Sequence, residues 1–309
     1  MNESLVKYLA GLLDADGSLS LTFRRDDNKP KHHYCGLKVA LHSSLAVDQK
    51  GFVSTLPELT GMGGFSRYGA RQQHYKWEVQ KRAHVEMLLP RLIKHMVVKG
   101  KHWQWLLETW RGCRRKPLTA KECVELRKAS TNSRATRSGP VRPKNHPTWA
   151  WLAGFLDGDG YYSNFLSHSK DGSVRRNMHT GCVAQKKDSH VLEFIQKAFG
   201  GHIYEHGQTK SCLTWKRSLG VANRSFALRF LPNLAKHSRL KRHKIDQMIH
   251  HHQQRLSTLS PKPRGYWTKE RVLAKALKYY SARAFMKHGQ GAYAAARRQG
   301  WLKDLVYRR

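Results

Sequence analysis

Two short acidic motifs carry the residue types best suited to chemistry in this sequence. The first reads LAGLLDADG over residues 9–17, and the second reads LAGFLDGDG 143 positions later, over 152–160. Each ends an apolar segment with two aspartates, Asp14 and Asp16 in one copy and Asp157 and Asp159 in the other. A helix C-terminus is partially negative and disfavours a further anion by up to ~1 kcal/mol. The motif therefore predicts that a positive partner of Asp16 and Asp159 lies outside it.

A helix followed at once by a strand must position these carboxylates. Apolar residues recur at helical spacing from Leu5 to about Asp14, and Gly17 is placed as a helix stop. Apolar and polar residues then alternate over 18–24, as in a strand with one buried face. A single D-x-D-G sequence most often has a capping or solvated role. Two matched copies, each opening a strand, instead favour a duplicated functional unit.

The repeat continues beyond the motifs. Each copy adds a second alternating strand, a helix-like segment, a polar hairpin (67–79 and 202–215) and one long final helix (84–110 and 229–254). In these final segments Lys99 and Lys241 stand at matched positions, nine residues after Pro90 and Pro232. A lysine in so basic a chain is ordinarily solvated, but this recurrence gives a functional role equal weight.

We therefore predict two domains of one kind, spanning 1–128 and 148–255. The intervening 129–147 is rich in Ser, Thr, Arg, Pro and Asn and predicts an extended linker. A basic extension, 256–309, follows the second domain and contains the sequence GAYAAARRQGWL at helical spacing. A chain of 309 residues is long enough for two domains with cores of their own.

The charge composition limits the classes of molecule that this protein could bind. The chain has 57 Lys and Arg against 21 Asp and Glu, a net charge of +36, which predicts a polyanion. A membrane surface is the alternative, but no apolar run approaches the ~18 residues of a spanning helix and the N-terminus does not resemble a signal peptide. Five cysteines without a C-x-x-C pair predict a reducing, intracellular protein with neither disulfides nor a zinc knuckle. We predict nucleic acid as the partner and no membrane.

The duplicated motifs, their spacing and the matched lysines resemble those of the monomeric LAGLIDADG homing endonucleases, over about residues 5–255. The resemblance implies an α+β fold of two pseudo-twofold-related α-β-β-α-β-β-α domains with saddle-shaped antiparallel sheets, plus a small helical C-terminal extension. Small residues (Ala10, Gly11, Ala153 and Gly154) would let the two motif helices pack closely. The implied activity is site-specific hydrolysis of both strands of double-stranded DNA across the minor groove, at a long asymmetric target, by a monomer.

The resemblance also implies a metal site. Asp16 and Asp159 would bind divalent cations together with the carbonyls of Ala15 and Gly158. Hard oxygen ligands favour Mg²⁺, with Mn²⁺ as a substitute and Ca²⁺ supporting binding without cleavage. A structural hydrogen-bonding role is left to Asp14 and Asp157.

Four further residues have implied catalytic roles. Lys99 and Lys241 would stabilise transition-state charge or assist a water. Gln185 resembles the water-positioning polar residue of the family, and His42 takes the corresponding place in the first half. Histidine there is a departure from the family pattern, so positioning a water and contacting a phosphate both stay open for His42.

Target recognition is expected from the polar faces of the strands, because a two-stranded ribbon fits the major groove. Phosphate contacts should dominate affinity and make it salt-dependent, and a solvated or phosphate-contacting role weighs as much as base contact at each position. The candidates are Ser20, Thr22, Arg24, Lys38, Arg67, Arg71, Gln73, Lys76, Tyr162, Asn164, His168, Arg175, Asn177, His179, Tyr204, His206 and Gln208.

Other functions remain open on the same fold. One is a group I intron RNA maturase, and another is a DNA-binding protein that does not cleave; two intact acidic motifs favour the nuclease. A start at Met1, just before the first motif, favours an intron-encoded or free-standing protein over an intein. The C-terminal extension either resembles a basic module attached to such nucleases, gripping flanking DNA, or forms a helical pad that packs on the second domain through Tyr293 and Trp301.

Overall fold

The structure is a computed structural model that describes residues 1–44, 51–137, 139–140, 147–168, 174–205, 211–218, 226–258 and 266–307. It divides into two compact units, Met1–His252 and Gln253–Arg309, which are described separately.

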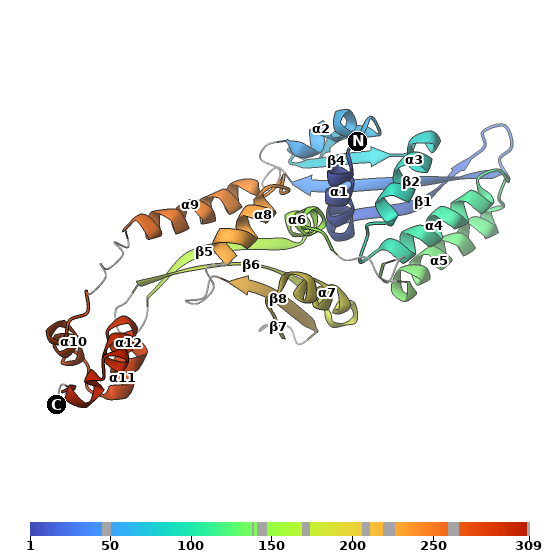
Figure 1. The fold of residues 1–309 in the computed structure, drawn as a ribbon. Coiled ribbons are helices and arrows are strands. Elements are labelled where there is room, and N and C mark those ends of the chain that lie inside the picture. The colour runs from blue at the N-terminus through green and yellow to red at the C-terminus, as the bar shows by residue number, and fades with distance from the viewer. Residues whose placement is uncertain are drawn as a thin grey trace. The chain divides into compact units, whose positions relative to one another are not determined.

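The larger unit contains two copies of one element order (Figure 1). The first copy consists of α1 (Glu3–Asp16), β1 (Gly17–Arg25), β2 (His33–Ser44), α2 (Phe52–Thr60), β3 (Gly64–Tyr68), β4 (His74–Val79), α3 (Arg82–Ile93), α4 (Gly100–Cys113) and α5 (Ala120–Thr136). The second consists of α6 (Trp149–Gly158), β5 (Gly160–His168), β6 (Val174–Gln185), a short 3₁₀ turn (Lys186–Asp188), α7 (His190–Phe199), β7 (His202–Glu205), β8 (Cys212–Ser218), a π-helical turn (Phe226–Phe230), α8 (Leu231–Ala235) and α9 (Arg242–Thr258), whose residues after His252 are counted with the smaller unit.

Each copy builds a four-stranded antiparallel sheet, in the orders β1-β2-β4-β3 and β5-β6-β8-β7. Alternation along the strands separates two faces. In the first sheet Leu19, Val39 and Trp77 face the helices and are buried. The opposite side, here called the open face, carries Ser18, Ser20, Thr22, Arg24, Lys38, Ala40, His42, Ser44, Ser66, Tyr68, His74, Lys76 and Glu78.

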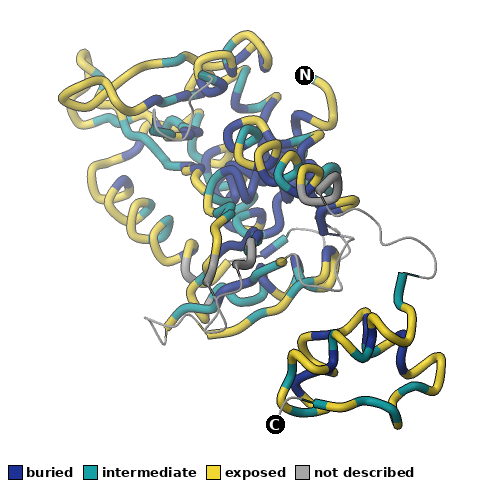
Figure 2. Tube along the Cα trace, turned by 90° about the vertical axis from the view of Figure 1, so that its left-hand side faces the viewer, coloured by how far each residue is buried: buried dark blue, intermediate teal, exposed yellow. Residues whose placement is uncertain are grey.

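Helices α1 and α6 pack against each other at the centre of the unit, where buried residues concentrate (Figure 2). Their contact depends on two glycines. A Cβ atom on Gly11 would lie 1.9 Å from the carbonyl oxygen of Trp151, and one on Gly154 would lie 2.0 Å from that of Tyr8. Because only glycine fits where one helix backbone meets the other, the motif's small residues fix how closely the two helices approach.

The final helix predicted for each copy is interrupted, which corrects the sequence prediction. In the first copy residues 94–99 separate α3 from α4, and in the second residues 236–241 separate α8 from α9. The cause is tertiary: backbone N–H groups of both segments donate to a buried motif aspartate, as described below. These bonds replace those a continuous helix would make.

The extended linker predicted from residue 129 is also incorrect in its first part, because α5 continues to Thr136. A capping box starts this helix: Thr119 accepts from the backbone N–H of Glu122, and the Glu122 carboxylate accepts from that of Thr119. Arg127 of α5 lies over the Phe23 ring of β1.

The smaller unit contains α10 (Lys269–Ala276), α11 (Ala282–His288), α12 (Gln290–Arg298) and a 3₁₀ turn (Trp301–Asp304). It has its own core around Val272 and Phe285, against which Tyr293 and Trp301 pack. The alanines of GAYAAARR are part of this core. Across both units, none of the helices in the described ranges combines the length and the apolarity needed to cross a membrane.

Candidate active site

Asp14 and Asp157 are buried and hold the two interrupted segments in place. Asp14 accepts from the backbone N–H groups of Val97 (2.6 Å) and Lys99 (2.8 Å). Asp157 accepts from the backbone N–H groups of residues 239, 240 and 241 at 2.7, 3.0 and 3.2 Å, and from the Ser238 hydroxyl at 2.7 Å. These bonds confirm the structural role predicted for both aspartates, and they position the lysine that ends each segment.

An aromatic residue of the opposite helix completes each of these networks. The Trp151 indole N–H of α6 donates to Asp14 at 2.9 Å, and the Tyr8 hydroxyl of α1 donates to Asp157 at 2.8 Å. Tyr8 and Trp151 occupy matched positions of the repeat. Each motif helix therefore helps to order the lysine segment of the other half, a reciprocal contact that the sequence did not predict.

Lys99 and Lys241 cap the C-terminal ends of α1 and α6 in the same way. The Lys99 ammonium donates to the carbonyls of Leu13, Ala15 and Gly17 at 3.1, 2.7 and 2.9 Å. The Lys241 ammonium donates to the matched carbonyls, those of residues 156, 158 and 160, at 3.1, 2.7 and 2.7 Å. A helix C-terminus presents unpaired carbonyls with partial negative charge, which a buried ammonium satisfies. Burial lowers the pKa of both lysines, against the opposing effect of nearby aspartates.

Asp16 and Asp159 meet where the two helices end. Although each residue reaches solvent, the surrounding protein desolvates both carboxyls. Burial and the negative charge of Asp159 raise the pKa of Asp16 to about 6, and burial raises the pKa of Asp159. The two carboxyls are close enough for protonated Asp16 to donate a hydrogen bond to Asp159. Two like charges held together in this way are the feature of the site that most favours a bound cation.

Gly158 leaves space for the Asp16 side chain because it has no Cβ atom. A Cβ atom at residue 158 would lie 2.5 Å from the Cβ of Ala15 and 3.0 Å from Oδ2 of Asp16. The motifs differ at this position, with Ala15 in one and Gly158 in the other. The difference is explained by packing, because two alanines would not fit across the contact.

The donors at this place fit a hard divalent cation. They are the two carboxylates and, next to them, the carbonyls of Ala15 and Gly158, each of which already accepts one lysine hydrogen bond and keeps a second lone pair. Within the described part of the chain, no three His, Cys, Asp or Glu side chains gather as a metal cluster. Mg²⁺ suits such a sparse site, because it is commonly held by one or two carboxylates, waters and substrate phosphates.

His42 and Gln185 do not occupy equivalent positions, which corrects the sequence prediction. Strand pairing matches Gly17 with Leu41, but Gly160 with Cys182. The counterpart of His42 is therefore Val183, and the counterpart of Gln185 is Ser44. The connection between β5 and β6 is two residues shorter than that between β1 and β2, and counting from the motif conceals the shift. The His42 ring contacts the Tyr68 hydroxyl at 3.0 Å, and burial lowers its pKa.

On the first sheet, five predicted DNA-contacting residues lie on the open face, where they have access to a ligand. These are Ser20, Thr22, Arg24, Lys38 and Lys76. Arg67 does not share this placement: it pairs with Tyr75 and lies against the Tyr75 ring on the helix-covered face. We therefore exclude Arg67 from the candidate interface.

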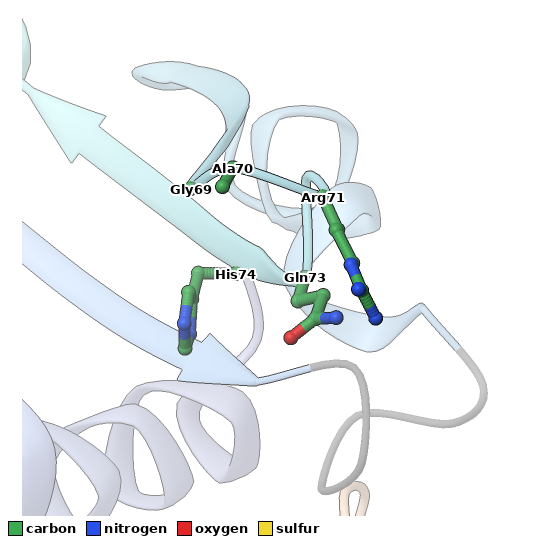
Figure 3. Close-up of a pocket in the computed structure, with 5 residues that line it drawn as sticks. All are labelled: Gly69, Ala70, Arg71, Gln73 and His74. Atoms are coloured by element: carbon green, nitrogen blue, oxygen red, sulfur yellow. The ribbon is translucent and has the colours of Figure 1, made fainter.

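Arg71 and Gln73 lie in the turn between β3 and β4, where residues 69–71, 73 and 74 line a shallow cavity of about 300 Å³. Figure 3 shows both side chains projecting from this turn toward the same side as His74, which belongs to the open face. They therefore extend the open face at its hairpin end.

The second sheet corrects two further predictions. Asn177, His179 and Tyr204 lie on its open face, but Tyr162 and Asn164 pair with Thr180 and Met178 on the buried face. The open-face residues of β5 and β8 that sequence reasoning missed include Tyr161, Ser163, Thr214 and Lys216. The signal was available, because the 143-residue offset matches Tyr162 with the buried Leu19. Four predictions, the side chains of His168 and Arg175 and the residues His206 and Gln208, lie outside the described residues.

Comparison with solved structures identifies the fold. The meganuclease I-SmaMI bound to uncleavable DNA is similar over 84% of this chain and 92% of that chain, with a TM-score of 0.59 and 17% identity. The LAGLIDADG homing endonuclease I-GzeII, in complex with its DNA target, is similar over 83% and 93%, with a TM-score of 0.60 and 13% identity. No protein-family model and no curated protein matches the sequence.

These similarities establish that the chain has the two-domain LAGLIDADG homing-endonuclease fold, and the α+β class with two antiparallel sheets predicted from the sequence is confirmed. At such low identity they establish the fold alone. What the site does must follow from its own residues.

Proposed function

We propose that this protein is a site-specific double-strand DNA endonuclease that acts as a monomer and requires a divalent cation. The observation that carries the proposal is the matched pair of sites at the ends of α1 and α6. Asp16 with Lys99 and Asp159 with Lys241 repeat one arrangement twice, within a single chain, at the place where the two helices meet. Two such sites suit a reaction that must be carried out once on each strand.

The chain's own residues have distinct tasks in this reaction. Asp14 and Asp157 hold the lysine segments, and the lysines neutralise the helix ends. Because each ammonium lies near the motif carboxyls that would hold the cation, Lys99 and Lys241 are placed to lower the cost of negative charge that develops on the phosphate. His42 and Gln185, on the open faces of the two sheets, remain candidates to orient a water or a phosphate.

The residues that would hold the cation are Asp16 and Asp159, with the carbonyls of Ala15 and Gly158. A bound divalent cation supplies Lewis-acid stabilisation of the phosphate and lowers the pKa of a bound water. Support for DNA and a divalent cation as partners comes from neighbours of the same fold: one is I-SmaMI bound to an uncleaved DNA target in the presence of calcium ions, and another is I-SmaMI bound to cleaved DNA.

The test is cleavage of a randomised duplex library in Mg²⁺, and in Ca²⁺ as a parallel reaction, followed by sequencing of the cut ends. We expect cuts on both strands at one long asymmetric site in Mg²⁺, and binding without cutting in Ca²⁺. Asp16→Asn and Asp159→Asn should each diminish cleavage of the selected site. Undiminished cleavage by either variant would refute the assigned site.

If the protein selects a site from the library by binding but does not cut that site in Mg²⁺, the proposed nuclease activity is refuted. That result would direct attention to the two alternatives that the fold accommodates, a non-cleaving DNA-binding protein and a maturase acting on intron RNA. A splicing reaction that proceeds equally well without the protein would then remove the maturase.

A further inference from the structure

Glu78 is the only acidic residue in the four strands of the first sheet, all of which are described, and it faces outward. A carboxylate is unexpected there, since the net charge of +36 and the open-face lysines both suit a polyanion. The second sheet has Lys216 at the corresponding position, opposite Gly181 as Glu78 is opposite Ala40. This contrast calls for a role specific to the first half.

The Glu78 carboxylate holds two lysines. Its oxygens lie 3.2 Å from the Lys38 ammonium and 2.5 Å from the Lys76 ammonium, and the Glu78 side chain is 20% exposed. Burial alone would raise the pKa of Glu78, but the adjacent ammonium groups of Lys76 and Lys38 outweigh it and lower the pKa, so the group is ionised at neutral pH. Ala40, directly opposite Glu78, is only 1% exposed although it lies on the open face, so neighbouring side chains close over it.

The three charged residues lie in the middle of the sheet. Lys38 belongs to β2, and Lys76 and Glu78 belong to β4, the two central strands in the order β1-β2-β4-β3. Two neighbouring strands are ~5 Å apart and enter a major groove ~12 Å wide, so central side chains lie over base edges while phosphates line the rims. A free lysine has a flexible four-carbon stem and would swing toward the nearest phosphate.

We propose that Glu78 is a specificity-determining residue: it holds Lys38 and Lys76 over base edges in the major groove and withholds them from the phosphate backbone. The inference rests on the proposed DNA-binding function. It assigns Glu78 an indirect action, through the two lysines. The carboxylate reduces affinity for DNA of any sequence, because it cancels one positive charge. It increases discrimination between base pairs, because an ammonium held in one place can hydrogen-bond only to bases with an acceptor there, whereas a mobile one can bind elsewhere.

The experiment uses the full chain carrying Asp16→Asn and Asp159→Asn, which prevents cutting. In this background, binding to the selected site, to sites with single base-pair changes and to an unrelated duplex is measured over a range of salt concentrations. Glu78→Gln keeps the side-chain shape and removes the charge. We expect it to bind unrelated duplex several-fold more tightly, with a salt slope steeper by about one. We also expect the penalty for base changes under the first sheet to fall from about tenfold toward none.

Glu205→Gln is the matched control. Glu205 is the only acid of β5–β8, it pairs with Lys186 at 2.7 Å, and it is exposed at the edge of its sheet. Its substitution removes the same charge and should raise general affinity without changing the penalty at any base pair. Lys38→Gln with Lys76→Gln should remove the discrimination, and adding Glu78→Gln to that pair should then have no further effect on it.

The outcomes separate this inference from the proposed function. A parent chain that selects no sequence would refute the proposed function, and this inference with it. A parent that selects a site, while Glu78→Gln keeps full discrimination under the first sheet, would overturn the inference alone. Equal loss of discrimination in Glu205→Gln would also overturn it, since total charge and not the held lysines would then be the cause.

Discussion

At the scale of single residues, Asp16 is held in a place that does not stabilise the metal-free protein. Its carboxyl shares a small volume with Asp159, and burial with that neighbouring charge raises its pKa to about 6. An aspartate in an unfolded chain has a pKa of ~3.9. The folded chain therefore retains this proton more tightly than the unfolded chain, and stability is lost as pH rises from about 4 through 6.

The first prediction concerns this charge. Asp16→Asn should raise the melting temperature of the metal-free protein at pH 7.5, where the parent carboxylate is ionised. It should have little effect near pH 3, below both pKa values, where Asp16 is protonated in the folded and the unfolded chain alike and resembles asparagine. Thermal melts in chelator at both pH values measure the difference. An equal shift at the two values would show that charge is not the cause.

The second prediction concerns Gly158, which makes room for Asp16. Gly158→Ala should slow cleavage by about 10²-fold, because the added methyl displaces Ala15 and Asp16 and small misplacements of reacting groups are that costly. The double variant Ala15→Gly with Gly158→Ala exchanges the two small residues and removes the Cβ–Cβ clash. It should recover much of the cleavage rate. Failure of the exchange to restore any activity would contradict the packing explanation.

At the scale of elements, the close packing of α1 against α6 depends on two glycines, Gly11 and Gly154, which have no side chain at the contact. The third prediction is that Gly11→Ala lowers the free energy of unfolding by about 3 kcal/mol, since its Cβ would overlap the Trp151 carbonyl of the opposite backbone. Gly112→Ala is the matched control. Gly112 lies in α4 with open space at its Cβ position, so this substitution should stabilise by up to ~1 kcal/mol. Urea titrations compare them, and equal effects would rule out the close contact as the cause.

The sequence predicted the motif helices and the strands that follow them because local periodicity and the duplication agree there. It did not predict the interrupted final helices, since the groups that break them are Asp14 and Asp157, distant in the chain. The error over His42 and Gln185 has a physical cause as well. A length difference of two residues preserves strand alternation, so His42 and Gln185 both lie on open faces although they are not equivalent positions. The helix α5 was missed although its capping box, Thr119 with Glu122, was visible.

At the scale of the whole molecule, a net charge of +36 should dominate affinity for nucleic acid. The fourth prediction is that association of the uncleaving double variant with duplex DNA weakens by about 10³–10⁵-fold between 50 and 200 mM salt, as expected for ~6–10 phosphate contacts. Fluorescence anisotropy at constant Ca²⁺ measures the slope. A slope near zero would contradict an interface dominated by phosphate contacts.

The reciprocal bonds from Tyr8 to Asp157 and from Trp151 to Asp14 also act as a form of self-recognition. Each half buries a carboxylate that accepts one of its hydrogen bonds from the other half's aromatic residue, and the two aromatics differ in size and in the reach of their donor. If the first half paired with a second copy of itself, Asp14 would face the phenol of Tyr8 in place of the indole N–H of Trp151. If the gene were divided between α5 and α6, the two polypeptides would accordingly select each other over themselves. The two copies of the repeat have thus diverged, so that Tyr8 and Trp151 cannot replace each other.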